Sequence, residues 1–96
     1  MKIILQGRTI GNEQEFHDVL SKQLDFGSYY GNNLSALWDR MTTDVERPVQ
    51  LVWKDSAVSR TAMGNGVFDK IISLFRDVEK HDREMGRGEA FSLILE

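Results

Sequence analysis

Three short apolar runs, separated by long stretches with helical periodicity, constrain the fold of this chain more than any other feature. The runs span residues 2–6, 49–54 and 90–95 and consist largely of Ile, Leu, Val and aromatic residues. Short runs of this composition predict strands. Parallel strands need long, usually helical crossover connections, which are right-handed. The pattern therefore predicts an α/β fold: a small two-layer domain with a three-stranded parallel sheet packed with about four helices.

Apolar spacing and capping residues predict where the helices lie. Asn12 is a candidate N-cap, and Glu15 completes a pair that resembles a capping box. Asp55 or Ser56 is a candidate cap for a short helix that ends near Met63. The predicted helices span about residues 13–25, 34–45, 56–63 and 66–82, and a loop is predicted over residues 81–89.

Length and missing residue types narrow the class of protein. A chain of 96 residues has the size of a single domain, so residues 1–96 are expected to form one unit. The chain has no cysteine, no apolar run near the length of a membrane span and no signal-peptide core. We therefore expect a cytoplasmic protein. The two histidines, His17 and His81, have no neighbours in a catalytic or metal-binding arrangement, so neither an enzyme, a metal site nor a cofactor is expected.

The acidic excess lies in one segment. The formal net charge is −3, from 12 basic and 15 acidic residues. Residues 25–46 hold four acids and one base, and the other residues hold 11 of each, so the whole excess falls in that segment. Proteins that bind the phosphates of RNA or DNA need clustered Lys and Arg. Direct binding to nucleic acid is therefore not expected, and neither is a polybasic membrane anchor.

The helix predicted after residue 33 has two distinct faces. At about 100° per residue, its core face consists of Leu34, Leu37, Met41 and Val45. A separate stripe consists of Trp38, Thr42, Ser35 and Asp39. Trp38 borders the core face, so burial and surface exposure are both open for it. Asp39 has Thr43, not a base, four residues further on, and is either a solvated acid or a functional one.

Residues 29–39 carry a recognisable motif. Their sequence, Tyr-Tyr-Gly-Asn-Asn-Leu-Ser-Ala-Leu-Trp-Asp, closely resembles the Tyr-Tyr-Gly-x-Asn-Leu-Asp-Ala-Leu-Trp-Asp signature of the barstar family. The resemblance extends over nearly the whole chain, through Lys2–Gly7, Val45–Pro48 with Trp53, and Phe75-Arg76-Asp77. It implies an intracellular inhibitor that binds a small, basic, secreted ribonuclease in a 1:1 complex. The second helix and the loop before it would enter the enzyme's active site, where acidic side chains stand in for RNA phosphates.

The resemblance also implies which residues contact the partner. Asp39 matches the acid at a phosphate position, and Tyr29 matches the aromatic residue that packs against a catalytic histidine. Gly31 matches a glycine that lets the backbone approach closely, and Asp77 stands where the family has a Glu. The complete set of expected partner-binding residues is Tyr29, Tyr30, Gly31, Asn33, Leu34, Ser35, Trp38, Asp39, Thr42, Asp44 and Asp77.

Departures from the family pattern leave the partner open. Ser35 replaces an Asp, Asp44 replaces a Trp, and Arg40 adds a positive charge beside the motif. These changes favour an immunity protein or antitoxin tuned to a ribonuclease other than barnase, including a ribonuclease toxin domain. The alternative is an interaction module of the same fold that binds a protein other than a nuclease.

Overall fold

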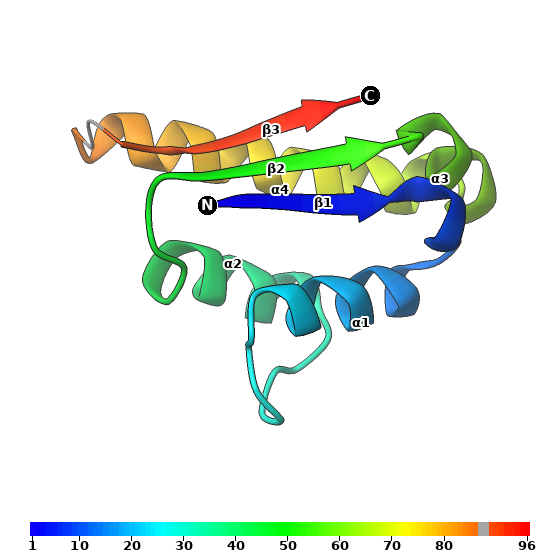
Figure 1. Cartoon of the computed structure of the whole chain (residues 1–96), viewed down its shortest axis with the longest axis horizontal. Coiled ribbons are helices and arrows are strands. Elements are labelled where there is room, and N and C mark those ends of the chain that lie inside the picture. The colour runs from blue at the N-terminus through cyan, green and yellow to red at the C-terminus, as the bar shows by residue number, and fades with distance from the viewer. Residues whose placement is uncertain (87–88) are drawn as a thin grey trace.

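Three parallel strands form the sheet of the computed structural model, which describes residues 1–86 and 89–96 (Figure 1). β1 (Lys2–Gln6) and β3 (Phe91–Leu95) flank β2 (Val49–Lys54), so the order is β1-β2-β3. The register aligns Ile3 with Leu51 and Leu51 with Leu93. The predicted parallel sheet is confirmed, because all three predicted runs form strands and both strand pairs are parallel.

Four helices connect the strands, as predicted. They are α1 (Glu13–Gln23), α2 (Leu34–Thr43), α3 (Ser56–Met63) and α4 (Asn65–Glu84), and a 3-10 turn, η1 (Gly7–Thr9), follows β1. α1 ends two residues before the predicted end, and Asp25 beyond it has a left-handed φ of 54°. α4 ends two residues beyond its predicted end at residue 82, so the loop begins after residue 84 and not at residue 81 as predicted. Of the predicted loop, Arg87 and Gly88 lie outside the described residues.

Two predicted caps have different outcomes. The Asn12 side chain accepts a hydrogen bond from the Glu15 amide at 2.8 Å, which confirms the N-cap of α1. The Glu15 carboxylate in turn accepts one from the Gly11 amide at 2.9 Å. Asp55 stands at the start of α3 with a left-handed φ of 50° and makes no capping bond. Its carboxylate instead pairs with Arg8, whose Nε lies 3.1 Å away, so Asp55 occupies the predicted N-cap position without a capping bond, and Ser56, the other candidate, is the first residue of α3.

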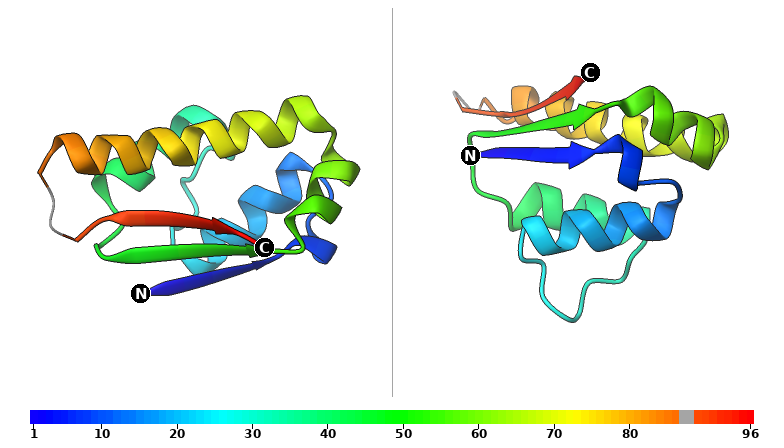
Figure 2. Two further views of the ribbon diagram at one scale, coloured as in Figure 1. Left: turned by 90° about the horizontal axis from the view of Figure 1, so that it is seen from above. Right: turned by 45° about the vertical axis from the view of Figure 1, so that its right-hand side comes forward.

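The helices lie on one side of the sheet, which gives the predicted two layers (Figure 2). Ile3, Leu51 and Leu93 are buried on the covered face. Phe16 of α1 stacks on Trp53 of β2 with ring centroids 5.4 Å apart and planes 10° apart. In the view of Figure 1, α1 and α2 thus lie below β1, and the outer side of α2 faces away from the sheet.

The carboxyl ends of β1 and β2 approach each other closely at Gly7. A Cβ at Gly7 would lie 2.2 Å from the carbonyl oxygen of Asp55, so a side chain cannot be accommodated there. The buried Ser59 hydroxyl donates to the Gly7 carbonyl at 2.8 Å and accepts from the Trp53 indole at 3.1 Å. These bonds tie α3 to the end of the sheet that lies away from the loop between α1 and α2.

Side chains occupy both outer edges of the sheet. On the β1 edge, Gln23 Nε2 donates to the Ile4 carbonyl at 2.8 Å. On the β3 edge, the Leu93 amide donates to a Glu79 carboxylate oxygen at 2.9 Å. Unpaired strand edges are sites where another strand can add. These contacts fill hydrogen-bonding positions that an added strand would need.

Candidate functional site

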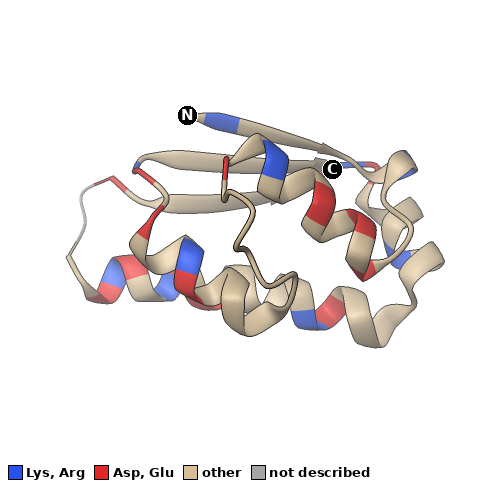
Figure 3. Ribbon diagram, turned by 90° about the horizontal axis from the view of Figure 1, so that it is seen from below, with Lys and Arg blue, Asp and Glu red and all other residues tan. Residues whose placement is uncertain are grey.

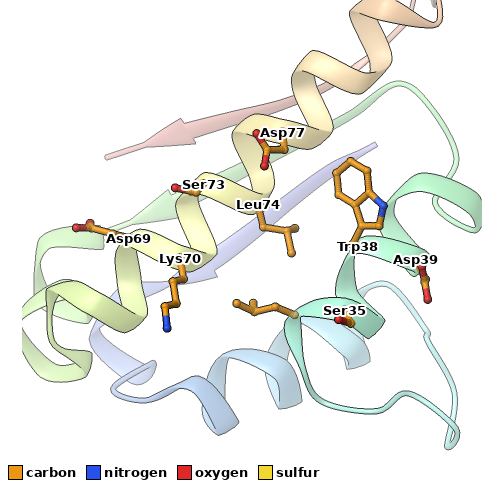
Figure 4. A pocket seen from close by; sticks show the side chains of 9 residues that line it. Ser35, Trp38, Asp39, Asp69, Lys70, Ser73, Leu74 and Asp77 are labelled. Atoms are coloured by element: carbon orange, nitrogen blue, oxygen red, sulfur yellow. The ribbon is translucent and has the colours of Figure 1, made fainter.

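A groove of about 590 Å³ lies between α2 and α4 (Figure 4). Its α2 wall consists of Leu34, Ser35, Trp38 and Asp39. Its α4 wall consists of Asp69, Lys70, Ser73, Leu74 and Asp77. The Leu74 side chain and the Trp38 ring face each other across the groove, with Asp77 near Trp38 and Lys70 towards the other end. The floor is therefore apolar, and the charged groups lie at its rim.

The two faces of α2 are as the helical spacing predicts. Leu37 and Met41 are fully buried, whereas Ser35 and Asp39 are exposed. Trp38 is half-buried, and its ring meets the ring of His81 on α4 edge-on at 5.6 Å. Both interpretations of Trp38 therefore hold in part, because the ring packs on α4 and also lines the groove.

Asp39 is an exposed carboxylate on a rigid element. It lies in the middle of α2, beside Trp38. Within the described part of the chain, no Lys or Arg forms an ion pair with it. Across the groove, Asp77 contributes a second exposed carboxylate from α4. Together with the apolar floor, the two acids can receive a cationic side chain by charge-assisted hydrogen bonds.

The loop before α2 presents one tyrosine and buries the other. Tyr29 is 94% exposed, whereas Tyr30 is 8% exposed. The Tyr30 ring packs against Phe26, and its hydroxyl lies 2.7 Å from Nδ1 of His17. Burial is the main cause that raises the pKa of the Tyr30 hydroxyl, and the charge of Glu13 raises it further. The Tyr30 side chain, one of the expected partner-binding residues, therefore faces the protein interior.

Asn33 and Gly31 shape the start of α2. The Asn33 side chain accepts a hydrogen bond from the Ala36 amide at 2.8 Å, which makes Asn33 the N-cap of α2. Its Nδ2 donates to the Gly31 carbonyl at 3.1 Å. A Cβ at Gly31 would lie 3.1 Å from that same Nδ2. Glycine at position 31 thus leaves room for the capping side chain.

Leu34, Ser35 and Thr42 differ in how much of each reaches the surface. Leu34 is half-buried and packs against the core at one edge of the groove. Ser35 is exposed in the first turn of α2, which contains no acidic residue. The Thr42 hydroxyl donates to the Trp38 carbonyl of its own helix at 2.7 Å. Ser35 therefore presents a side chain to the groove, whereas the Thr42 hydroxyl is engaged within α2.

Asp44 lies apart from the other predicted residues. It caps the C-terminus of α2, and its carboxylate lies 3.3 Å from Nη1 of Arg40. The Arg40 guanidinium lies 5.7 Å from the centroid of the Phe26 ring. Asp44 lines a different pocket, together with Asp25 and Glu46. The structure therefore does not bring Asp44 to the groove, and Arg40 offsets its charge.

The surface around the groove has few charges on its loop side. Residues 26–38 contain no Asp, Glu, Lys or Arg, and Figure 3 shows this stretch in tan between α1 and the charged part of α2. Asp39 is the first acid after this stretch, so its charge stands beside an uncharged loop.

Most of the α4 wall was not predicted from the sequence. Only Asp77 was expected there, through the family resemblance. Counting back from Asp77 in steps of four reaches Ser73 and Asp69, and steps of three and seven reach Leu74 and Lys70. Helical spacing alone could have identified these residues once Asp77 was placed beside α2.

Other kinds of site find no support in the described residues. Over residues 1–86 and 89–96, no group of three or more His, Asp or Glu residues lies close enough to hold a metal ion. Among the same residues, no helix is both long and apolar enough to cross a membrane. The α2–α4 groove and the Tyr29 loop therefore remain the candidate site.

Comparison with known proteins places this chain in a family. A family model described as "Barstar (barnase inhibitor)" matches residues 1–96. The "Putative ribonuclease inhibitor YrdF" of Bacillus subtilis (strain 168) is 36% identical over 95 residues, and the alignment covers 99% of this chain and 98% of the relative. The sheet, the four helices and the match over all 96 residues agree. The chain belongs to the barstar family.

Proposed function

We propose that this protein inhibits a small bacterial ribonuclease by covering its active site with α2 and the Tyr29–Asn33 loop. The description of the family and the name of the B. subtilis relative both support an inhibitor role. In this proposal the chain acts as one domain, binds the enzyme in a 1:1 complex and catalyses no reaction itself.

The mechanism follows from what a ribonuclease active site must contain. An enzyme that cleaves RNA binds phosphates with Arg, Lys and His side chains. A carboxylate held in the position of a phosphate forms short, charge-assisted hydrogen bonds with the same groups. Asp39 occupies this role in the proposal, and Asp77 extends the acidic surface from α4. The substrate is excluded because the inhibitor fills its place.

One observation carries the proposal: the Asp39 carboxylate is exposed and forms no ion pair with a Lys or Arg within residues 1–86 and 89–96. An isolated acid on a flexible loop would lose conformational entropy on binding, whereas α2 holds Asp39 in place beforehand. The core contacts of Leu37 and Met41 fix the rotation of the helix, so Asp39 faces outward. The acid is thus presented in the orientation that a partner meets.

The neighbouring residues take distinct roles in this proposal. Tyr29, which is almost fully exposed, packs against a catalytic histidine of the enzyme. Leu34 and Trp38 supply apolar contact with the enzyme, and Ser35 and Thr42 lie beside these two residues on α2. Gly31 and Asn33 shape the loop. We propose that Tyr30 supports the loop because it is buried, and that Asp44, beside Arg40 and outside the groove, is a separate contact.

The sheet edges are poor alternatives as an interaction surface. A partner that adds a strand needs free backbone groups at an edge. Gln23 and Glu79 already occupy such groups on the outer strands. The groove and the Tyr29 loop are therefore the better surface for either class of partner, a nuclease or another protein.

Charge favours a basic secreted ribonuclease or ribonuclease toxin as the partner. Opposite charges raise the rate of association, which matters for a cell that makes its own nuclease. We propose that the two proteins meet in the cytoplasm, and a chain without cysteine suits that reducing compartment.

The test is titration of small ribonucleases of the producing bacterium, and of barnase, with the purified protein while RNA cleavage is followed. The proposal expects at least one enzyme to lose its activity at a molar ratio near one. Co-expression should also protect host cells from that enzyme. If the protein binds a non-nuclease partner and leaves every tested ribonuclease active, the interaction-module alternative is favoured instead.

A further inference from the structure

A buried histidine links α1 to the loop that precedes α2. His17 is 1% exposed, and its two ring nitrogens both have partners. Nδ1 lies 2.7 Å from the hydroxyl oxygen of Tyr30, and Nε2 lies 3.0 Å from a carboxylate oxygen of Glu13. Three side chains thus form a continuous chain of hydrogen bonds from the loop to the first turn of α1.

The direction of these hydrogen bonds follows from the chemistry of the groups. The Glu13 carboxylate can only accept, so the Nε2 that faces it carries a proton, and the Tyr30 hydroxyl can donate to Nδ1. A neutral imidazole that accepts at Nδ1 carries its proton on Nε2, which can then donate to the Glu13 carboxylate. This tautomer satisfies both ring nitrogens of His17.

The hydrogen bonds of His17 with Tyr30 and Glu13 fix the position of Tyr30, the residue next to Tyr29. Tyr30 is anchored by its hydroxyl to His17 and by its ring to Phe26, with centroids 4.9 Å apart. Phe26 in turn lies beneath the Arg40 guanidinium of α2. Tyr29, one residue earlier, is almost fully exposed and has no such anchor. The position of the exposed ring therefore depends on the anchor of the buried one.

We propose that His17, oriented by Glu13, is a positioning residue that acts through Tyr30 and holds the Tyr29–Asn33 loop in its binding shape in the free protein. The role of the loop in binding rests on the proposed function. Order that exists before binding lowers the entropy cost of the complex. Loss of the network should therefore loosen the loop and speed dissociation, with little change in the charge that governs association.

Tyr30→Phe tests the proposal because it removes the hydroxyl and keeps the ring. Nitrogen-15 relaxation of the free protein measures the order parameters of the loop amides. We expect values of about 0.8 for residues 29–32 in the wild type and values below about 0.6 in the variant. Values in α1 and α2 should not change. Unchanged order parameters of residues 29–32 in Tyr30→Phe would overturn the proposal. Order parameters already below about 0.6 for these residues in the wild type would overturn it as well.

Ser59→Ala is the matched control, because it also removes one buried hydroxyl but lies at the end of the sheet away from the loop. It should lower stability and leave the loop order unchanged. If Ser59→Ala loosens residues 29–32 as much as Tyr30→Phe does, the effect is general destabilisation and the positioning role is contradicted.

The wild-type protein provides a second test that needs no variant. The nitrogen-15 shifts of the His17 ring report which nitrogen carries the proton. The proposal expects a protonated Nε2 and an unprotonated Nδ1. The opposite tautomer would contradict the hydrogen-bond order from Tyr30 to Glu13.

Binding kinetics separate this proposal from the proposed function. With a ribonuclease that the wild type inhibits, Tyr30→Phe should dissociate about 10-fold faster, as expected for the loss of one hydrogen bond. If Tyr30→Phe inhibits fully and dissociates at the wild-type rate, the positioning role is contradicted and the proposed function is not. A loop that loosens as expected in a protein that inhibits no ribonuclease supports the positioning of the loop and contradicts the proposed function.

Discussion

The guanidinium of Arg47 lies against the buried carboxylate of Asp82, with Nε 2.7 Å from Oδ2 and Nη2 3.1 Å from Oδ1. The same guanidinium donates to the carbonyls of Val45 and Met41 at 2.7 Å each. Asp82 also accepts a hydrogen bond from the Phe91 amide at 2.7 Å. This ion pair therefore joins the C-terminus of α2 to the last turn of α4 and the start of β3.

Arg47→Met should destabilise the protein strongly, because it removes the guanidinium that pairs with the buried Asp82 carboxylate. Removal of one partner from a buried pair costs about 3–5 kcal/mol. Urea denaturation measures the change. The control is Arg8→Met, which breaks the exposed Arg8–Asp55 pair and should cost no more than about 1 kcal/mol.

Adding Asp82→Asn to Arg47→Met should restore part of the stability, because the amide oxygen can still accept from the Phe91 amide and carries no charge. A double variant as unstable as Arg47→Met alone would show that the buried negative charge of Asp82 is not the cause.

Stability should fall at high pH because of Tyr30. Burial holds the pKa of its hydroxyl above the usual value of about 10, so the unfolded chain loses this proton at a lower pH than the folded protein. The contribution is fully present below about pH 10 and is lost as pH rises from there towards the folded pKa. Denaturation between neutral pH and about pH 11 should show this decline.

The two tyrosines provide their own control for this prediction. Tyr30→Phe should flatten the decline, whereas Tyr29→Phe should not, because Tyr29 is exposed. Ultraviolet titration of tyrosinate should show a tyrosine that resists titration in the wild type and is absent from Tyr30→Phe. An equal decline in wild type and Tyr30→Phe would contradict the assignment.

Much of the local structure could be predicted from the sequence, because neighbouring residues determine it. Asn12 caps α1 through the amide of Glu15, three residues away, and the spacing of Leu37 and Met41 orients α2. The last two residues of α4 were not predicted, and Asp82 beside them is held by Arg47, 35 residues earlier. The missing capping bond of Asp55 likewise involves a distant residue, because its carboxylate pairs with Arg8, 47 residues away.

The candidate site likewise has parts that follow from nearby residues in the sequence and parts that depend on distant ones. Its α2 wall follows from helical spacing and from the motif at residues 29–39. The α4 wall depends on how two helices pack, which spacing within each helix does not determine. The burial of Tyr30 beside an exposed Tyr29 depends on His17, and the motif alone gave no sign of that contact.

Ser35→Asp should increase affinity for barnase, because it supplies the acid that the family signature has at this position. The exposed site lies in the first turn of α2, where a negative charge also stabilises the helix by about 0.3–1 kcal/mol. Inhibition of barnase should strengthen by roughly 10-fold at low salt. Ser73→Asp adds the same charge from the α4 wall and is the control. Equal gains from both variants would mean that total charge, not position, determines the preference.

Lys70→Gln should speed association with a basic ribonuclease. Lys70 is an exposed cation at the rim of the groove, and a rim charge acts mainly on the association rate. An increase of about 3-fold is expected at low salt, and it should shrink near 1 M salt as the charges are screened. Lys54→Gln, at the end of β2, is the control. Slower association would indicate that Lys70 meets an acidic group of the partner.

In the proposed function the Asp39 carboxylate stands in for an RNA phosphate, and the affinity of Asp39→Asn for an inhibited ribonuclease tests this role. Asn keeps the size of the side chain and removes the charge, and Asp18→Asn on α1 makes the same change away from the groove. Loss of one charge from such a pair costs about 2–5 kcal/mol at interfaces, for which barnase–barstar is itself the reference case. We predict that Asp39→Asn binds at least about 30-fold more weakly, with an unchanged circular dichroism spectrum, while Asp18→Asn inhibits almost as wild type. Equal inhibition by Asp39→Asn and wild type would contradict this role.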